Sequence, residues 1–124
     1  MFYSLLIVDD EKEIRDSLTN YFPWEKCGFK VVQSLGNANE AFEYVKKHPV
    51  DVILTDIKMP FMSGLDLIKK IKSEIADPII FCLLSAHKDF DFARKGISLG
   101  VRHYLLKPTE FEVITDAFQT IKKE

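Results

Sequence analysis

The sequence predicts an α/β domain in which a doubly wound sheet of five parallel strands carries helices on both faces. Three observations lead to this prediction. Short apolar runs alternate with longer segments whose apolar residues recur every three or four positions, and turn-forming residues separate the two kinds of segment. The first run contains the uninterrupted apolar stretch Leu5 to Val8, which is typical of a strand buried on both faces of a parallel sheet. The five runs are residues 4–8, 30–34, 51–55, 79–84 and 101–106.

The first helix is expected to begin near Glu11 and to end before Pro23, because proline cannot continue a helix. Ile14, Leu18 and Tyr21 recur at helical spacing, so we expect them to lie on the side that faces the sheet. An apolar stripe of this kind is what a helix needs in order to pack on a sheet.

Four further helices are predicted from the same period. One covers residues 89–99 and is followed by Gly100, which suits the left-handed backbone that closes a helix. The apolar positions of the other three are Ala41, Phe42 and Val45, then Leu65, Ile68 and Ile71, and finally Phe111, Ile114, Phe118 and Ile121. Five strand and helix units with short connections predict an open, flavodoxin-like sheet, because a closed barrel needs more units. The connection 22–29 is longer than a tight turn, and Trp24 is expected to pack it against the sheet edge.

Length and composition fit one domain, which is expected to span residues 1–124. The 17 basic and 19 acidic side chains give a net charge of −2, so bulk charge gives no reason to expect binding to nucleic acid or anionic lipid. The N-terminal MFYSLLIV is too short to span a membrane and lacks the basic start of a signal peptide, which predicts a cytoplasmic location. Cys27 and Cys82 have no partners at metal-ligand spacing, so two reduced thiols are expected.

Carboxylates follow two of the predicted strands. Asp9 and Asp10 end the first strand and Asp56 ends the third, at the edge where open α/β sheets bind ligands. One of the paired aspartates could simply cap the next helix, although a single cap explains only one of them. Three carboxylates at one edge raise each other's pKa unless a cation is present. Because oxygen ligands suit a hard divalent ion, the sequence predicts a Mg²⁺ site that Mn²⁺ can also fill.

Two more polar residues are expected at the same edge, since Ser85 ends the fourth strand and Lys107 ends the fifth. Taken singly, Ser85 is more simply a helix cap, and Lys107 is more simply a counter-ion to Asp9 or Asp10. Taken together with Asp56, they predict a phosphoryl acceptor. A metal ion and an ammonium group neutralise phosphoryl oxygens, and a hydroxyl group donates a hydrogen bond to them.

The stretches LLIVDDE, DVILTDIKMPFMSGLDLI, LLSA and GVRHYLLKP resemble, in this order, those of bacterial response-regulator receiver domains. The resemblance covers nearly the whole chain and implies a signalling switch, not an enzyme acting on an external substrate. It implies that Asp56 is the phosphoacceptor. It also implies that Asp9, Asp10, Asp56 and the backbone carbonyl of Lys58 hold Mg²⁺.

The same resemblance implies roles for the remaining site residues. Lys107 and Ser85 are expected to bind the phosphoryl oxygens, and Ser85 and Tyr104 are expected to change position together as a switch. A cis peptide bond is implied between Lys107 and Pro108, a bond type that X-Pro pairs tolerate better than others.

Three positions depart from the pattern of the receiver family. The family usually has Gly where Phe61 stands, often has Asp where Ser63 stands, and has Thr more often than Ser at the position of Ser85. The first two changes predict a stiffer turn after Asp56. The third keeps the hydroxyl donor.

The resemblance also implies partners. A sensor histidine kinase is expected to donate the phosphoryl group, and an output domain beyond residue 124 is expected to receive the signal. The segments PWEKCGF and SAHKDFDFARKGISLG resemble receivers joined to AraC-type helix-turn-helix output domains, which predicts a transcriptional output. Two copies are expected to pair through the helix 89–99, the strand 101–106 and the last helix. This domain itself is expected to bind neither nucleic acid nor membrane.

Two alternatives remain open from the sequence. A stand-alone receiver would dock on a separate effector protein instead of its own output domain. A haloacid-dehalogenase-like phosphatase also uses an aspartate nucleophile with Mg²⁺, but its first strand should end in Asp-x-Asp, where this chain has Asp9, Asp10 and Glu11.

Overall fold

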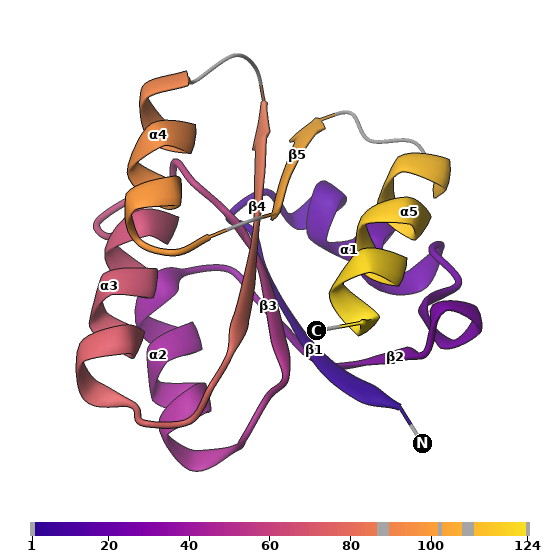
Figure 1. The fold of residues 1–124 in the computed structure, drawn as a ribbon, viewed down its shortest axis with the longest axis horizontal. Helices are drawn as coiled ribbons and strands as arrows, with labels where there is room; N and C mark the ends of the chain where they lie inside the picture. The colour runs from indigo at the N-terminus through magenta and orange to yellow at the C-terminus, as the bar shows by residue number, and fades with distance from the viewer. Residues whose placement is uncertain (1, 87–89, 102, 108–110, 124) are drawn as a thin grey trace.

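The computed structural model describes residues 2–86, 90–101, 103–107 and 111–123. Five strands lie parallel in one sheet in the order β2-β1-β3-β4-β5 (Figure 1). The chain therefore moves first to one side of β1 and then to the other, as in the predicted doubly wound sheet. The strands are β1 (Tyr3–Val8), β2 (Phe29–Leu35), β3 (Val52–Asp56), β4 (Ile80–Ala86) and β5 (His103–Lys107).

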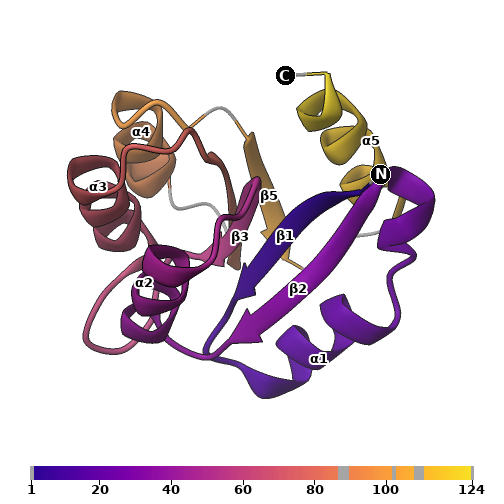
Figure 2. The same ribbon diagram turned by 90° about the horizontal axis from the view of Figure 1, so that it is seen from below.

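Helices cover both faces of the sheet. They are α1 (Lys12–Asn20), α2 (Ala38–Lys47), α3 (Gly64–Glu74), α4 (Phe90–Ser98) and α5 (Phe111–Lys122), with a short 3₁₀ helix, η1 (Trp24–Cys27), between α1 and β2. Figure 2 shows α2, α3 and α4 on one face and α1 and α5 on the other. The predicted alternation of strands and helices is confirmed.

The central strands are apolar on both sides because helices cover both faces of the sheet. Leu6 and Ile53 are buried on the side of α2 and α3, and Leu5 and Leu54 are buried on the side of α5. This arrangement explains why the strands read as continuous apolar runs. Burying one such side chain contributes about 1.5–3 kcal/mol, so these contacts hold the strands and helices together.

The packing predicted for η1 and α5 is confirmed. Trp24 is buried, its Nε1 donates a hydrogen bond to the carbonyl oxygen of Leu18 at 2.7 Å, and its ring meets that of Phe118 edge-on with centroids 4.8 Å apart. The side chain of Phe111 lies outside the described part of the chain. The other predicted apolar positions of α5 are buried, namely Ile114, Phe118 and Ile121.

The prediction for Tyr21 is wrong. Tyr21 is the C-cap residue of α1 and is 75% exposed, whereas Ile14 and Leu18 are half-buried on the helix. The N–H of Tyr21 still donates to the Ser17 carbonyl at 3.0 Å, but at this end of the helix the ring points into solvent. The next two aromatic residues, Phe22 and Trp24, bury instead and leave no interior place for the Tyr21 ring.

Other local expectations are confirmed. Gly100 has φ +87° where α4 closes, and both thiols are free and buried. Burial raises the pKa of Cys82 to about 12, which makes this thiol inert in the folded protein. In the part of the chain that the structure describes, no helix is both long enough and apolar enough to cross a membrane.

The start of β1 and the end of α5 meet at Gly28, at the edge where the strands begin. The backbone N–H of Tyr3 donates to the Gly28 carbonyl at 2.9 Å. Gly28 has φ +89°, and a β-carbon added there would lie 2.9 Å from Lys122 Nζ. Glycine suits this position because the backbone is left-handed, a conformation that a residue with a β-carbon rarely adopts.

Candidate functional site

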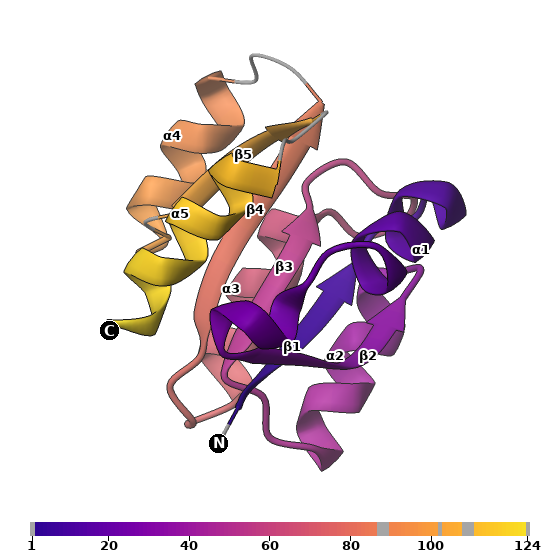
Figure 3. The same ribbon diagram turned by 90° about the vertical axis from the view of Figure 1, so that its right-hand side faces the viewer.

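The carboxyl ends of the strands converge at one edge of the sheet. Figure 3 shows the strand arrows pointing toward this edge. Because Val8 pairs with Thr55, Asp9 stands directly after β1 beside Asp56, the last residue of β3. Lys107 ends β5, two strands further along the sheet. The order of the strands in this doubly wound sheet thus brings these side chains together.

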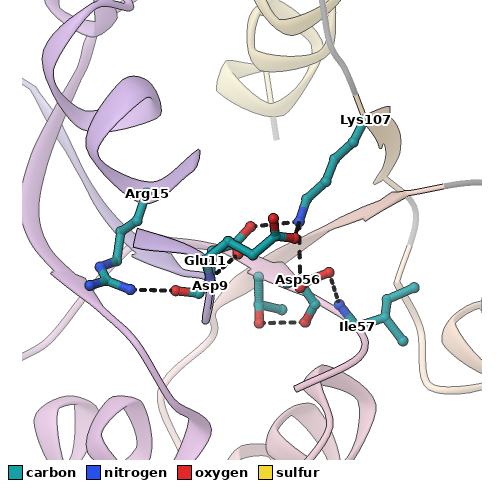
Figure 4. A network of polar contacts seen from close by, with 7 residues as sticks. Asp9, Glu11, Arg15, Asp56, Ile57 and Lys107 are labelled. Carbon is teal, nitrogen blue, oxygen red and sulfur yellow. Dashed lines mark hydrogen bonds and ion pairs between the residues drawn. The ribbon is translucent and has the colours of Figure 1, made fainter. Parts of the chain in front are cut away.

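Lys107 lies among three carboxylates (Figure 4). Its Nζ is 2.8 Å from Asp9 Oδ2, 3.4 Å from Asp56 Oδ2 and 3.6 Å from Glu11 Oε1, and its side chain is only 9% exposed. Burial alone would lower the pKa of Lys107, but the close contact with Asp9 and the charges of Asp56, Asp9 and Glu11 outweigh burial and raise it. Lys107 is therefore a fixed positive charge at neutral pH.

Asp56 is the buried carboxylate of the site. It is 6% exposed, and its Oδ1 accepts a hydrogen bond from the backbone N–H of Ile57 at 2.8 Å. Burial is the main cause that raises the pKa of Asp56 to about 7, and the negative charge of Asp9 adds to it, against the opposing charge of Lys107. In the absence of a further cation, the carboxyl group of Asp56 therefore keeps its proton up to a pH close to neutral.

Asp9 is held through its backbone N–H, its backbone carbonyl and one of its two carboxylate oxygens. Its Oδ1 accepts from the backbone N–H of Glu11 at 2.9 Å, its N–H donates to the Leu35 carbonyl at 3.1 Å, and its own carbonyl accepts from Arg15 Nη1 at 2.7 Å. Neither Asp9 nor Asp10 caps α1, because the N-cap residue is Glu11, which makes no side-chain cap. Helix capping therefore explains neither of the paired aspartates.

The acidic cluster has the composition of a site for a hard divalent cation. Carboxylate oxygens of Asp9, Asp10, Glu11 and Asp56 all lie within 4.8 Å of one another. Asp9 Oδ2 is buried and accepts no hydrogen bond within the described residues, and its ion pair with Lys107 leaves lone pairs free. An all-oxygen donor set that includes two buried carboxylates, Asp9 and Asp56, fits Mg²⁺ or Mn²⁺.

The other predicted site residues lie on β4, on β5 and in the segment that follows β3. Ser85 is buried in β4, and Lys58 is exposed just after β3. Tyr104 pairs with Leu83 across β4 and β5, and its ring packs against the core under α3. The Tyr104 hydroxyl is buried without a hydrogen-bond partner among the described residues. The peptide bond before Pro108 lies outside the described residues, so the expected cis geometry stays a prediction.

The loop between β3 and α3 contains two of the three positions that depart from the pattern of the receiver family. Phe61 has φ +71° and is fully exposed, which places a bulky residue in the left-handed region that glycine normally occupies. The Ser63 side chain accepts from the backbone N–H of Asp66 at 3.1 Å and so caps α3. The turn after Asp56 thus contains one residue in left-handed backbone and one helix cap, and its expected stiffness stays a prediction.

Two residues that contact the site were not predicted. Glu11 approaches Lys107, and Arg15 holds the backbone of Asp9. The signal for Glu11 was available, since it continues the acidic run after β1. Arg15 gives no such signal, because an arginine one turn into a helix reads as a solvated position.

The doubly wound sheet, with acids and a lysine at its carboxyl edge, has the architecture of a receiver-type signalling domain. The sequence matches the response regulator receiver domain over residues 5–119, and the chain therefore belongs to that family.

Relatives and solved structures agree with this assignment. The chain is 35% identical to the uncharacterized transcriptional regulatory protein YesN of Bacillus subtilis over 98% of its own length and 33% of that protein. It is 33% identical to the transcriptional regulatory protein HptR of Staphylococcus aureus, over 87% of this chain and 42% of that one. The REC domain of AraT, a response regulator from Geobacillus stearothermophilus, superposes with a TM-score of 0.89 at 31% identity, covering 99% of this chain and 95% of that one. The chain thus spans less than half of these curated relatives.

Proposed function

We propose that this domain is a phosphorylation-controlled switch in which Asp56 accepts a phosphoryl group from the phosphohistidine of a sensor histidine kinase in the cytoplasm. The observation that carries the proposal is the position of the Lys107 ammonium, 3.4 Å from Asp56 Oδ2 and 2.8 Å from Asp9 Oδ2. An ammonium so placed stands ready to pair with oxygens added to Asp56.

The chemistry follows from the surroundings of Asp56. A carboxylate oxygen of Asp56 attacks phosphorus, the P–N bond of the phosphohistidine breaks, and its electron pair leaves on the imidazole nitrogen. Only the ionised carboxylate can attack, yet the pKa of Asp56 is raised to about 7. Lys107 and a divalent cation both favour the ionised form.

The metal in this proposal is held by Asp9, Asp10, Asp56 and the backbone carbonyl of Lys58. When bound, Mg²⁺ supplies positive charge that ionises Asp56 and neutralises the phosphoryl oxygens. Ser85 donates a hydrogen bond to the same oxygens.

The signal leaves the site through Ser85 and Tyr104 in this proposal. As Ser85 moves toward the phosphoryl group, Tyr104 fills the space beside β4, and the surface of α4, β5 and α5 changes. The unpartnered hydroxyl supports two competing arrangements of Tyr104, because burying it without a hydrogen bond costs about 1–3 kcal/mol. Phosphorylation then shifts the population between them.

The changed surface is proposed to promote pairing of two copies and to control an AraC-type helix-turn-helix output domain beyond residue 124. The printed names of YesN and HptR, both transcriptional regulatory proteins and both longer than this chain, support a transcriptional output. A reading frame that continues into two helix-turn-helix patterns would bear this out. A stop codon after residue 124 would favour a stand-alone receiver that docks on another protein. Salt-dependent DNA binding by residues 1–124 would contradict the proposal that DNA binding belongs to the output domain.

Labelling of Asp56 tests the central step. The protein is incubated with acetyl phosphate and Mg²⁺, trapped with borohydride and digested for mass spectrometry. We expect one modification, at Asp56, that disappears when EDTA removes the metal and returns with Mn²⁺. Asp51→Asn is the matched control, since Asp51 lies at the opposite edge of the sheet and pairs with Ser4. Undiminished labelling of Asp56→Asn would show that the acceptor is another residue.

A further inference from the structure

Arg15 and Lys107 contact Asp9 from opposite sides (Figure 4). Lys107 contacts the carboxylate of Asp9 at 2.8 Å, whereas Arg15 Nη1 donates to the backbone carbonyl of Asp9 at 2.7 Å. The Arg15 side chain is half-buried and extends from the first turns of α1. This is a placed side chain, unlike the solvated lysine of the same helix, Lys12, which is 78% exposed.

We propose that Arg15 is a positioning residue for the metal site, an inference that rests on the proposed function. The carbonyl oxygen that Arg15 holds belongs to the peptide group joining Asp9 to Asp10. Because a peptide group is planar, a hydrogen bond to its oxygen also fixes the direction in which the chain enters Asp10. One guanidinium group thus orients both of the consecutive metal ligands without touching the metal.

The neighbouring strand supports this arrangement. Leu35, the last residue of β2, accepts the N–H of Asp9 at 3.1 Å, and Gly36 follows it. A β-carbon on Gly36 would lie 3.0 Å from Arg15 Nη1, closer than such a contact normally allows. The absence of a side chain at Gly36 therefore leaves room for the guanidinium in the place from which it reaches Asp9.

The sign of the effect separates positioning from simple charge. Arg15 is a positive charge near an acidic cluster, so by Coulomb repulsion alone its removal would strengthen Mg²⁺ binding. If Arg15 orients the ligands, its removal instead weakens Mg²⁺ binding, by roughly tenfold, as for other groups that orient metal ligands. The two roles predict opposite changes in one measured constant.

The test is the Mg²⁺ dissociation constant, measured by calorimetry on the native protein and on Arg15→Gln, Arg15→Lys, Gly36→Ala and Lys12→Gln. We expect roughly tenfold weaker binding for Arg15→Gln and partial recovery for Arg15→Lys. Gly36→Ala keeps every charge but displaces the guanidinium, so we expect a smaller loss in the same direction. Lys12→Gln removes one exposed charge from the same helix and is expected to bind as tightly as the native protein, or slightly more tightly.

Unfolding curves in EDTA establish which variants are folded. If Arg15→Gln does not fold, Mg²⁺ binding by Gly36→Ala tests whether Arg15 orients the metal ligands. Unchanged or tighter Mg²⁺ binding by the folded Arg15 and Gly36 variants would overturn the positioning role while leaving the proposed function intact. Absence of Mg²⁺ binding by the native protein would instead overturn the metal site of the proposed function, and this inference with it.

Discussion

Gly64 packs directly against the main chain of Asp56: a β-carbon added at Gly64 would overlap the Asp56 carbonyl oxygen. The N–H of Gly64 also donates to the Ile57 carbonyl at 2.8 Å, so the first turn of α3 is fastened to the end of β3. The side chain of Asp56 thus projects from backbone that is held by the start of a helix.

We expect Gly64→Ala to lower the free energy of unfolding by about 1–3 kcal/mol, although alanine normally favours a helix over glycine. The clash involves backbone, which cannot move aside. Gly96→Ala in α4 is the matched control, because the one close contact of its β-carbon, at 2.9 Å, would be with the end of the flexible Leu83 side chain and not with backbone. Urea unfolding should give a smaller loss for Gly96→Ala, and equal losses would contradict this account.

Phe61 offers a test of backbone strain beside the site. At φ +71° a residue with a β-carbon is disfavoured relative to glycine, and the fully exposed ring of Phe61 gains little from packing. We therefore expect Phe61→Gly to be more stable than Phe61→Ala by about 1 kcal/mol, measured as a difference in urea midpoints at constant slope. Similar stability of the two variants would mean that the loop relaxes this strain.

The raised pKa of Asp56 predicts how stability depends on pH in metal-free protein. Asp56 titrates near 3.8 when unfolded and near 7 when folded, mainly because of burial. Between these values the folded state binds the extra proton, so the free energy of unfolding falls as pH rises through this window. Asp56→Asn removes this loss, and its gain should be near zero at about pH 4 and reach on the order of 1–3 kcal/mol above about pH 7.

Urea unfolding in EDTA at several pH values measures this gain, with the exposed Glu74→Gln as a control for the loss of one acid. Added Mg²⁺ should remove the difference between Asp56→Asn and the native protein, because the cation stabilises the ionised carboxylate. A gain of the same size at all pH values would mean that Asp56 is not the group responsible.

Lys107→Ala should separate the phosphorylation of Asp56 from the change that phosphorylation causes at the surface of α4 and α5. The variant keeps the nucleophile and the carboxylates, so we expect slower but detectable labelling of Asp56. Without the ammonium no ion pair forms with the phosphoryl group, and hydrogen exchange in α4 and α5 should no longer change on labelling. A normal exchange response in the Lys107→Ala protein would rule out the proposed role.

Tyr104→Phe removes a buried hydroxyl that has no partner among the described residues. We expect this variant to be as stable as the native protein or up to about 1–2 kcal/mol more stable, because the cost of desolvating the hydroxyl disappears. Tyr104→Leu, which also lacks the hydroxyl but has a different shape, controls for packing. A clear loss of stability in Tyr104→Phe would indicate that the hydroxyl makes a hydrogen bond.

The fold could be predicted from the sequence because short apolar runs, such as Leu5 to Val8, indicate buried strands without reference to the rest of the chain. The convergence of Asp9, Asp56 and Lys107 could be predicted as well, since it follows from strand order and direction. The exposure of Tyr21 could not be predicted, because it depends on which of several neighbouring aromatic rings is buried. The contact between Arg15 and Asp9 could not be predicted either, since the partner of Arg15 is a backbone carbonyl, which every residue possesses.

The meeting of β1 and α5 at Gly28 has a practical consequence for protein engineering. The Tyr3 backbone is hydrogen-bonded to this residue and the end of the Lys122 side chain lies beside it, so a glycine-rich linker could join the two ends of the described chain. New ends could then be opened in the exposed connection around Pro49, which lies between α2 and β3. Such a circular permutant would keep the acidic edge of the sheet intact and would allow a fluorescent reporter to be inserted at a chosen distance from Asp56.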